Sequence, residues 1–237
     1  MSRNKMTLMN KPTIRIDIVS DVVCPWCYIG KRRLEKAVSQ LSDRYHFELE
    51  YHPFELNPDM PAQGVNQQEY LSNKFGGPDR YEQITGHTTR VAAGEGLDFH
   101  FEKQQTSPNT RNAHRLIGLA RDENKQLAMV ELLFQAYFTD GVDLSKNENL
   151  VTLAVQAGLD RGKVEKLLSG DEGLPEVVLA EKEMQKLGVT GVPFYIVNQT
   201  YGVSGAQTPD IFIKLIEEIN APVALDGEAC NVDGSNC

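Results

Sequence analysis

The stretch SDVVCPWC, residues 20–27, joins an alternating apolar run, Ile14–Val19, to a segment with helical periodicity. In that segment apolar residues recur at three- and four-residue steps from Leu34 to Leu41, which predicts one buried helix face. The two cysteines of the stretch therefore lie where a strand ends and a helix begins. Cys24 is predicted at the helix N-terminus, and Cys27 one turn further on.

This position favours redox chemistry. Unpaired backbone N–H groups and the positive end of the helix dipole stabilise a thiolate at a helix N-terminus. Cys27 is within reach of a disulfide with Cys24, and Pro25 is compatible with the first helical turn. A C-x-x-C at a strand–helix junction is typical of a thiol–disulfide motif. We therefore expect Cys24 to be the exposed nucleophile and Cys27 its buried partner.

Two other roles for a C-x-x-C pair stay open at this point. A structural zinc ion needs four ligands, usually from a second close pair, but Cys230 and Cys237 are far along the chain and no suitably spaced His pair accompanies them. We predict no metal site. A purely structural disulfide is the second alternative.

Composition narrows the class of protein. The chain has 237 residues, 41% of them hydrophobic, and a net charge of −9, which disfavours nonspecific nucleic-acid binding. Polar residues interrupt the first apolar run, so it is neither a signal peptide nor a membrane span. We expect a cytoplasmic protein without nucleic-acid or membrane partners, as a monomer or a homodimer. Cysteines in a reducing compartment favour catalysis, sensing or metal binding over permanent disulfides.

The order of the predicted elements divides the chain. Strand, helix and strand patterns before residue 58 form a β-α-β unit with parallel strands. A block of helices follows, and a helix, two short strands and a final helix come after it. We predict an α/β fold with one discontinuous domain, residues 13–58 and 174–220, a large all-helical insertion, residues 59–173, and a C-terminal tail, residues 221–237.

That arrangement, with C-x-x-C after the first strand, resembles the DsbA-like thioredoxin family and in particular its FrnE-type cytoplasmic branch. The likeness covers about residues 13–220 and is specific because several motifs occur together. These motifs are Ser20–Gly30, His52–Pro58, Asn109–Arg115, Gly188–Phe194 and Tyr201–Gln207.

The resemblance implies a substrate-binding loop beside the cysteines. Val192-Pro193 would form a cis peptide there and present backbone groups to an extended substrate. Trp26 would pack over the site. From the residues alone, an ordinary trans proline at the start of a strand stays open.

The function implied is thiol–disulfide oxidoreductase or isomerase activity on protein or small-molecule disulfides. Cys24 would attack the substrate, and Cys27 would resolve the mixed disulfide. No cofactor is expected, although glutathione is a candidate reductant or co-substrate. Related 2-hydroxychromene-2-carboxylate isomerases and kappa-class glutathione transferases typically have Ser where Cys24 stands, so a glutathione-dependent isomerase or transferase is one alternative. A thiol-bearing chaperone or binding module is another.

Three polar residues are weaker candidates. Asp21, three residues before Cys24, is interpreted as a turn or cap acceptor, with proton transfer as the alternative. Asp17 belongs either beneath the motif or on the polar face of the first strand. His114 has either a structural or an active-site role.

The tail contains a second pair of cysteines. Cys230 and Cys237 flank an Asp-Gly turn signal, so they are predicted to form an accessory redox pair that communicates with Cys24. A static clip, mixed dimers and idle thiols are the alternatives.

Overall fold

The computed structural model describes residues 11–221. Its centre is a four-stranded sheet in the order β2-β1-β5-β6, formed by β1 (Thr13–Ser20), β2 (His46–Pro53), β5 (Phe194–Val197) and β6 (Tyr201–Ser204). β1 and β2 are parallel, whereas β5 runs antiparallel to both β1 and β6. The predicted β-α-β unit and the later strand pair are confirmed.

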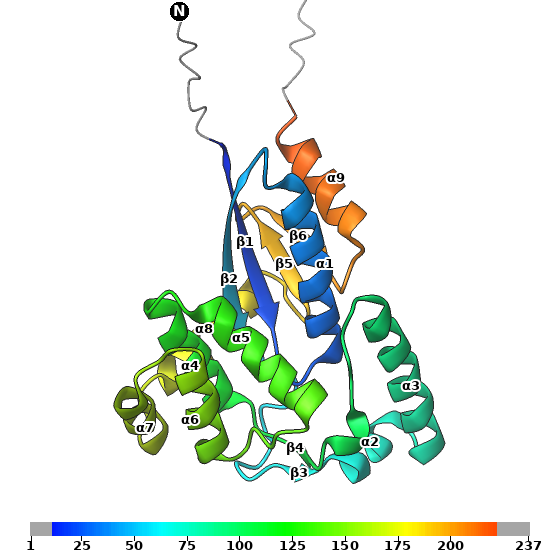
Figure 1. Cartoon of the computed structure of the whole chain (residues 1–237), viewed down its shortest axis with the longest axis vertical. Coiled ribbons are helices and arrows are strands. Elements are labelled where there is room, and N and C mark those ends of the chain that lie inside the picture. Colours follow the sequence, from blue (N-terminus) through cyan, green and yellow to red (C-terminus); the bar gives the residue numbers. More distant parts are fainter. Residues whose placement is uncertain (1–10, 222–237) are drawn as a thin grey trace, which may run out of the picture.

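One face of the sheet is covered by α1 (Pro25–Leu41) and α9 (Pro209–Ile219) (Figure 1). The side chains of Ile14, Ile16 and Ile18 are fully or almost fully buried, as the alternation of β1 requires. This packing fixes the start of α1 at the end of β1, which is where the cysteines lie.

The opposite face is covered by α8 (Leu174–Lys186), which packs against β2. Here Val19 and Ile196 of the sheet form a small buried cluster with Met184 and Val189. Helices therefore lie on both faces of the sheet, and the molecule has the α/β/α layers expected of this fold class.

Six helices form most of the segment between β2 and α8. In Figure 1, α2 and α3 lie on one side below the sheet, and α4 to α7 lie on the other. Phe101–Lys103 forms a 3₁₀ turn and Ala136–Asp140 a π turn that extends α5. The helices are α2 (Gln67–Phe75), α3 (Pro78–Gly94), α4 (Arg111–Asp122), α5 (Gln126–Gln135), α6 (Asn147–Gln156) and α7 (Arg161–Ser169).

The insertion is not entirely helical. β3 (Val65–Asn66) and β4 (Thr106–Ser107) pair in an antiparallel ladder. Each strand has two residues, which is too short for an alternating pattern to be visible in the sequence. The prediction of an all-helical insertion is corrected in this detail.

An aromatic stack joins α1 to the insertion. The ring of Tyr28, directly after Cys27, stacks on Phe134 with 4.8 Å between centroids, and Phe99 stacks on Phe138 at 4.7 Å. Glu131 of α5 accepts hydrogen bonds from Tyr28, Lys31 and Arg32 of α1. These contacts hold the helix that carries the cysteines against the insertion.

The outer edge of β2 is also partly covered by the insertion. The side-chain amide of Gln126 accepts the N–H of Tyr51 at 2.9 Å and donates to its carbonyl oxygen at 2.9 Å. A single glutamine thus replaces a strand partner at this position, so less of the sheet edge is open to pairing with another chain.

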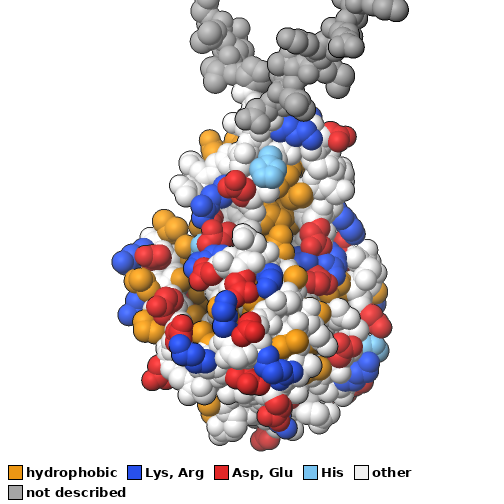
Figure 2. Space-filling view, turned by 60° about the vertical axis from the view of Figure 1, so that its left-hand side comes forward, with side chains coloured by type: hydrophobic (Ala, Val, Ile, Leu, Met, Phe, Trp, Pro, Cys, Tyr) orange, Lys and Arg blue, Asp and Glu red, His pale blue; other side chains and the backbone are white. Residues whose placement is uncertain are grey.

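None of the helices between residues 11 and 221 is long and apolar enough to cross a membrane. On the face shown in Figure 2, basic and acidic side chains are intermixed.

Candidate active site

Cys24 is the N-cap residue of α1, and Pro25 occupies the first turn. The backbone turns tightly here: the N–H of Cys24 donates to the carbonyl of Asp21 at 3.0 Å, and the N–H of Cys27 donates to the carbonyl of Cys24 at 3.0 Å. Both cysteines are free thiols, and their side chains interact with each other. The predicted helix-start position is confirmed.

Cys24 is not exposed, contrary to the sequence-based expectation. It is 5% exposed and Cys27 is 2% exposed. The loop that precedes β5 approaches Cys24, because its Sγ lies 3.8 Å from the carbonyl oxygen of Val192. The two thiols differ instead in access, since Cys24 lines a cavity that Cys27 does not reach.

Burial raises the pKa of the Cys27 thiol well above its ordinary value, and its contact with Cys24 raises the pKa further. Interactions with the Ser20 side chain and the Asp21 backbone act in the opposite direction but are weaker. Cys27 therefore stays protonated at neutral pH in the reduced protein, as expected of a resolving thiol.

The Val192–Pro193 peptide bond is cis. Pro193 is buried, and its carbonyl oxygen accepts the N–H of Gly205 at 2.8 Å, which ties this loop to the end of β6. The structure thus brings Val192 and Pro193 beside Cys24, although they are far away in the sequence.

Trp26 is half-buried and lines the same cavity as Cys24. Its ring is 6.2 Å from that of His87 in α3. Trp26, Cys24 and Pro25 line a cavity of about 360 Å³ that extends under α2 and α3.

Asp21 and His114 lie together, which their separation in the sequence did not indicate. Their side chains are 1% and 2% exposed, and Nε2 of His114 is 3.4 Å from Oδ1 of Asp21. Burial lowers the pKa of His114, but the negative charge of Asp21, together with those of Glu55 and Glu181, outweighs burial and raises the pKa overall. The other oxygen of Asp21 accepts the N–H of Leu56 at 2.8 Å. A buried carboxylate–imidazole pair therefore lies just behind the cysteine turn.

The His52–Pro58 and Asn109–Arg115 motifs contact each other near the Asp21–His114 pair. Nε of Arg111 donates to the buried carboxylate of Glu55 at 2.9 Å, and Asn109 donates to the carbonyl of Met60 at 2.8 Å. Burial raises the pKa of Glu55, and Arg111 opposes the rise. The sequence signal for this contact was the joint presence of the His52–Pro58 and Asn109–Arg115 motifs.

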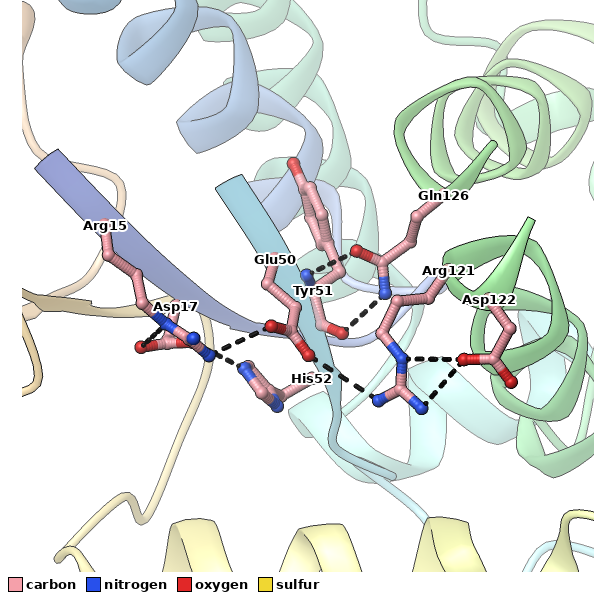
Figure 3. Close-up of polar contacts among 8 residues, drawn as sticks. All are labelled: Arg15, Asp17, Glu50, Tyr51, His52, Arg121, Asp122 and Gln126. Atoms are coloured by element: carbon pink, nitrogen blue, oxygen red, sulfur yellow. Dashed lines mark hydrogen bonds and ion pairs between the residues drawn. The ribbon is translucent and has the colours of Figure 1, made fainter. Parts of the chain in front are cut away.

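Asp17 does not lie beneath the cysteines. It accepts hydrogen bonds from Arg15 and lies 2.9 Å from Nε2 of His52 (Figure 3). It therefore belongs to the polar face of β1, the second of the two interpretations. Burial raises the pKa of Asp17, but His52 and Arg15 lower it below its ordinary value overall.

Asp17, Glu50 and His52 are close enough to be considered as metal ligands. However, Arg15 donates to both Asp17 and Glu50, at 2.8 and 2.9 Å, so a guanidinium already supplies the positive charge that the carboxylates require (Figure 3). The donor set fits an ion-pair network better than a metal ion.

Other residues at the site were not anticipated. The cavity walls formed by α2 and α3 were missed because their apolar residues look like ordinary core positions in the sequence. Cys230 and Cys237 lie outside the described residues, so the accessory pair is still a prediction.

The chain belongs to the family described as the DSBA-like thioredoxin domain, whose model matches residues 15–217. The resemblance to the DsbA-like thioredoxin family is thereby confirmed, whereas the FrnE-type branch is still a prediction. It is similar to a probable DsbA oxidoreductase from Streptomyces coelicolor, with 34% identity, 93% of this chain and 97% of that chain covered, and a TM-score of 0.82. It is also 26% identical over 207 residues to the uncharacterized protein YwbO of Bacillus subtilis, covering 87% of this chain and 97% of that protein.

More distant solved structures share the fold. One is the cytosolic disulfide reductase DsbM from Pseudomonas aeruginosa with GSH, at 16% identity and a TM-score of 0.61, covering 86% of this chain and 98% of that one. Another is a 2-hydroxychromene-2-carboxylate isomerase, at 18% identity and a TM-score of 0.63, covering 86% and 94%.

Proposed function

We propose that this protein catalyses thiol–disulfide exchange through Cys24 and Cys27. The observation that carries the proposal is the arrangement of two adjacent free thiols at the N-terminus of α1, with Cys24 facing a cavity and the Val192 carbonyl, and Cys27 buried behind it. A substrate sulfur can reach Cys24 from the cavity, while Cys27 is buried and contacts Cys24.

The steps follow from that arrangement. The Cys24 thiolate attacks a substrate disulfide, a Cys24–substrate S–S bond forms, and the first substrate thiolate leaves with the electron pair of the broken bond. Cys27 then loses its proton and attacks the sulfur of Cys24. The second substrate thiolate leaves, the substrate is reduced by two electrons, and the Cys24–Cys27 pair is oxidised. A low-molecular-weight thiol of the glutathione class would return the pair to the dithiol.

The loop at Val192 and Pro193 would hold the substrate. The Val192 carbonyl beside Cys24 can accept a hydrogen bond from the backbone of an extended peptide, and Trp26 can pack against its side chains. Disulfide-bonded proteins, peptides and small disulfides are therefore all proposed substrates. We further propose that the protein acts in the cytoplasm, as the FrnE-type branch does, and the related disulfide reductase DsbM is described as cytosolic.

The proposal is tested by glutathione-coupled reduction of a peptide disulfide and by reactivation of scrambled ribonuclease. Wild-type protein should turn over in at least one assay, Cys24→Ser should abolish turnover, and Cys27→Ser should accumulate a mixed disulfide with the substrate. A glutathione-dependent isomerase would instead act on a small aromatic substrate without net redox change. A thiol-bearing binding module would retain peptides but show no turnover, and either of these results would overturn the proposal.

A further inference from the structure

The cavity beside Cys24 is lined mainly by apolar and aromatic side chains. Its volume is about 360 Å³, within the roughly 300–1,000 Å³ typical of small-molecule sites. Aromatic side chains from α1, α2 and the 3₁₀ turn form much of its wall, namely Trp26, Tyr70, Phe75 and Phe101. Such walls favour a flat apolar group, because rings stack or pack edge to face on one another.

Three polar side chains of the lining already have hydrogen-bond partners. The hydroxyl of Thr88 donates to the carbonyl of Ile84 at 2.8 Å, and that of Thr85 to the carbonyl of Tyr81 at 2.9 Å. The amide of Gln104 donates to the carbonyl of Tyr137 and accepts from Gln67. An occupant therefore gains little from polar groups in the depth of the cavity and more from apolar area.

Lys74 differs from these polar side chains because it carries a charge. It is the one charged residue among the described residues that line this cavity, and no carboxylate in the described part of the chain pairs with it. Its ammonium donates to Oδ1 of Asn57 at 2.9 Å and lies 5.6 Å from the centre of the Tyr70 ring. These contacts hold one positive charge at the cavity wall while leaving N–H donors free.

We propose that this cavity binds the aromatic arm of a low-molecular-weight disulfide whose ring carries a carboxylate, with the ring between the aromatic walls, the carboxylate at Lys74 and the disulfide at Cys24. This inference rests on the thiol–disulfide exchange proposed above and names its substrate class. In a protein of net charge −9, such an anion needs a local cation to approach. Glutathione lacks an aromatic arm, so substrate and reductant would be different molecules.

The chemical step is a simple exchange. The Cys24 thiolate attacks the sulfur nearer the bound ring, a Cys24–aryl disulfide forms, and the S–S bond of the substrate breaks. The distal thiolate leaves with the electron pair. Release of an aryl or pyridyl thiolate is followed by its absorbance, and reaction of an aliphatic disulfide is followed by the intact mass of the Cys24 adduct.

The test uses full-length protein with Cys27→Ser, Cys230→Ser and Cys237→Ser, so that Cys24 is the only thiol. Second-order rates are measured with three probes: 5,5′-dithiobis(2-nitrobenzoate), which is aromatic and anionic, 2,2′-dithiodipyridine, which is aromatic and neutral, and 2-hydroxyethyl disulfide, which is small and aliphatic. Each variant is compared with its parent for the same probe, so the intrinsic reactivity of the probes cancels.

Lys74→Met should slow the anionic probe about threefold and leave the neutral aromatic probe unchanged, since an ion pair near the surface is worth a few-fold at most. The matched control is Lys186→Met, an equal charge change on exposed α8, which should change neither rate. Equal slowing by the two lysine variants would overturn the role of Lys74.

Leu71→Trp, which fills the cavity from α2, should slow both aromatic probes about tenfold or more and leave the aliphatic probe within about twofold. Phe75→Ala, at a partly exposed wall position, gives a second variant with the same direction if Leu71→Trp does not fold. Slowing of all three probes alike would overturn the binding role of the cavity while leaving the exchange chemistry intact. Failure of every probe to react with Cys24 would instead overturn the proposed function itself, and this inference with it.

Discussion

Sγ of Cys24 lies 3.8 Å from the carbonyl oxygen of Val192, so the thiol at the start of α1 and the loop before β5 form one site. Cys27 lies outside this contact and is almost fully buried. The different surroundings of the two thiols lead to the first prediction.

Cys27 should be alkylated far more slowly than Cys24 at neutral pH. Its burial and its contact with Cys24 raise its pKa, so little thiolate is present to react. Peptide mapping after timed iodoacetamide treatment of the reduced protein separates these cysteines from Cys230 and Cys237. We expect modification of Cys24 first, and Cys27 should still react more slowly in a Cys24→Ser variant, because burial alone keeps its pKa raised and its sulfur inaccessible. Faster labelling of Cys27 would reverse the assigned roles.

The buried Asp21–His114 pair should make stability depend on pH. Because folding raises the pKa of His114, the stability that this residue contributes is fully present below its unfolded-state pKa of about 6.5. That stability is lost as the pH rises through the higher pKa of the folded state. Asp21→Asn removes the carboxylate that holds the proton, while Glu55 and Glu181 still face the imidazole. We expect it to cost about 2 kcal/mol or more near pH 6 and less near pH 9, by urea unfolding.

The matched control for that experiment is Asp43→Asn, at an exposed position. Its effect should be small and nearly independent of pH. A difference between wild type and Asp21→Asn that stays constant or grows from pH 6 to pH 9 would contradict the ionised pair.

Gly30 of α1 leaves room for the Tyr195 hydroxyl. A Cβ at Gly30 would lie 2.2 Å from the Tyr195 hydroxyl, and that buried hydroxyl has no hydrogen-bond partner among residues 11–221. Gly30→Ala should therefore destabilise the protein by about 1–3 kcal/mol through overpacking. Tyr195→Phe should be close to neutral, and the double variant should recover most of the loss. Equal stability of Gly30→Ala and the double variant would show that the hydroxyl is not the obstacle.

Glu131 should stabilise the junction between α1 and α5. Burial raises the pKa of Glu131, but hydrogen bonds from Arg32 and Lys31 outweigh it and lower the pKa from 4.5 to about 2. Because folding lowers the pKa of Glu131, its ion pairs stabilise the protein fully above its ordinary pKa of about 4.5. This stabilisation is lost as the pH falls through the folded-state pKa of about 2. Glu131→Gln should cost about 2–3 kcal/mol at neutral pH, because it leaves Lys31 buried with less charge compensation.

Thermal unfolding of Glu131→Gln across pH checks this prediction. The difference in unfolding temperature between Glu131→Gln and wild type should shrink as the pH approaches 2. Glu165→Gln, which breaks an exposed pair with Arg161, serves as the control and should cost under about 1 kcal/mol. A cost for Glu131→Gln no greater than this control would mean that the network adds no net stability.

The elements that the sequence predicted well are those with a clear period. The alternation of Ile14, Ile16 and Ile18 and the helical spacing from Leu34 to Leu41 placed the cysteines at a strand–helix junction, as observed. Local spacing carries this information because each side chain faces the core through its own element.

Contacts between distant elements were not predictable in this way. Nothing near Asp21 indicates that His114 of α4 lies against it. The position of Val192 beside Cys24 was predicted by the family resemblance and not by any local spacing. Such contacts depend on how the insertion packs on the sheet. No pattern in the sequence indicated that Leu71 and Phe75 of α2 line a cavity beside Cys24.

A redox titration of the reduced protein in glutathione buffers, read by intact mass and peptide mapping, tests the central claim most directly. We expect a reversible two-electron transition that forms a Cys24–Cys27 disulfide, with a midpoint between about −300 and −120 mV, the range spanned by thioredoxin-fold oxidoreductases. Formation of stable glutathione adducts on Cys24 without the intramolecular disulfide, or no change at either cysteine across that range, would contradict a redox-active pair.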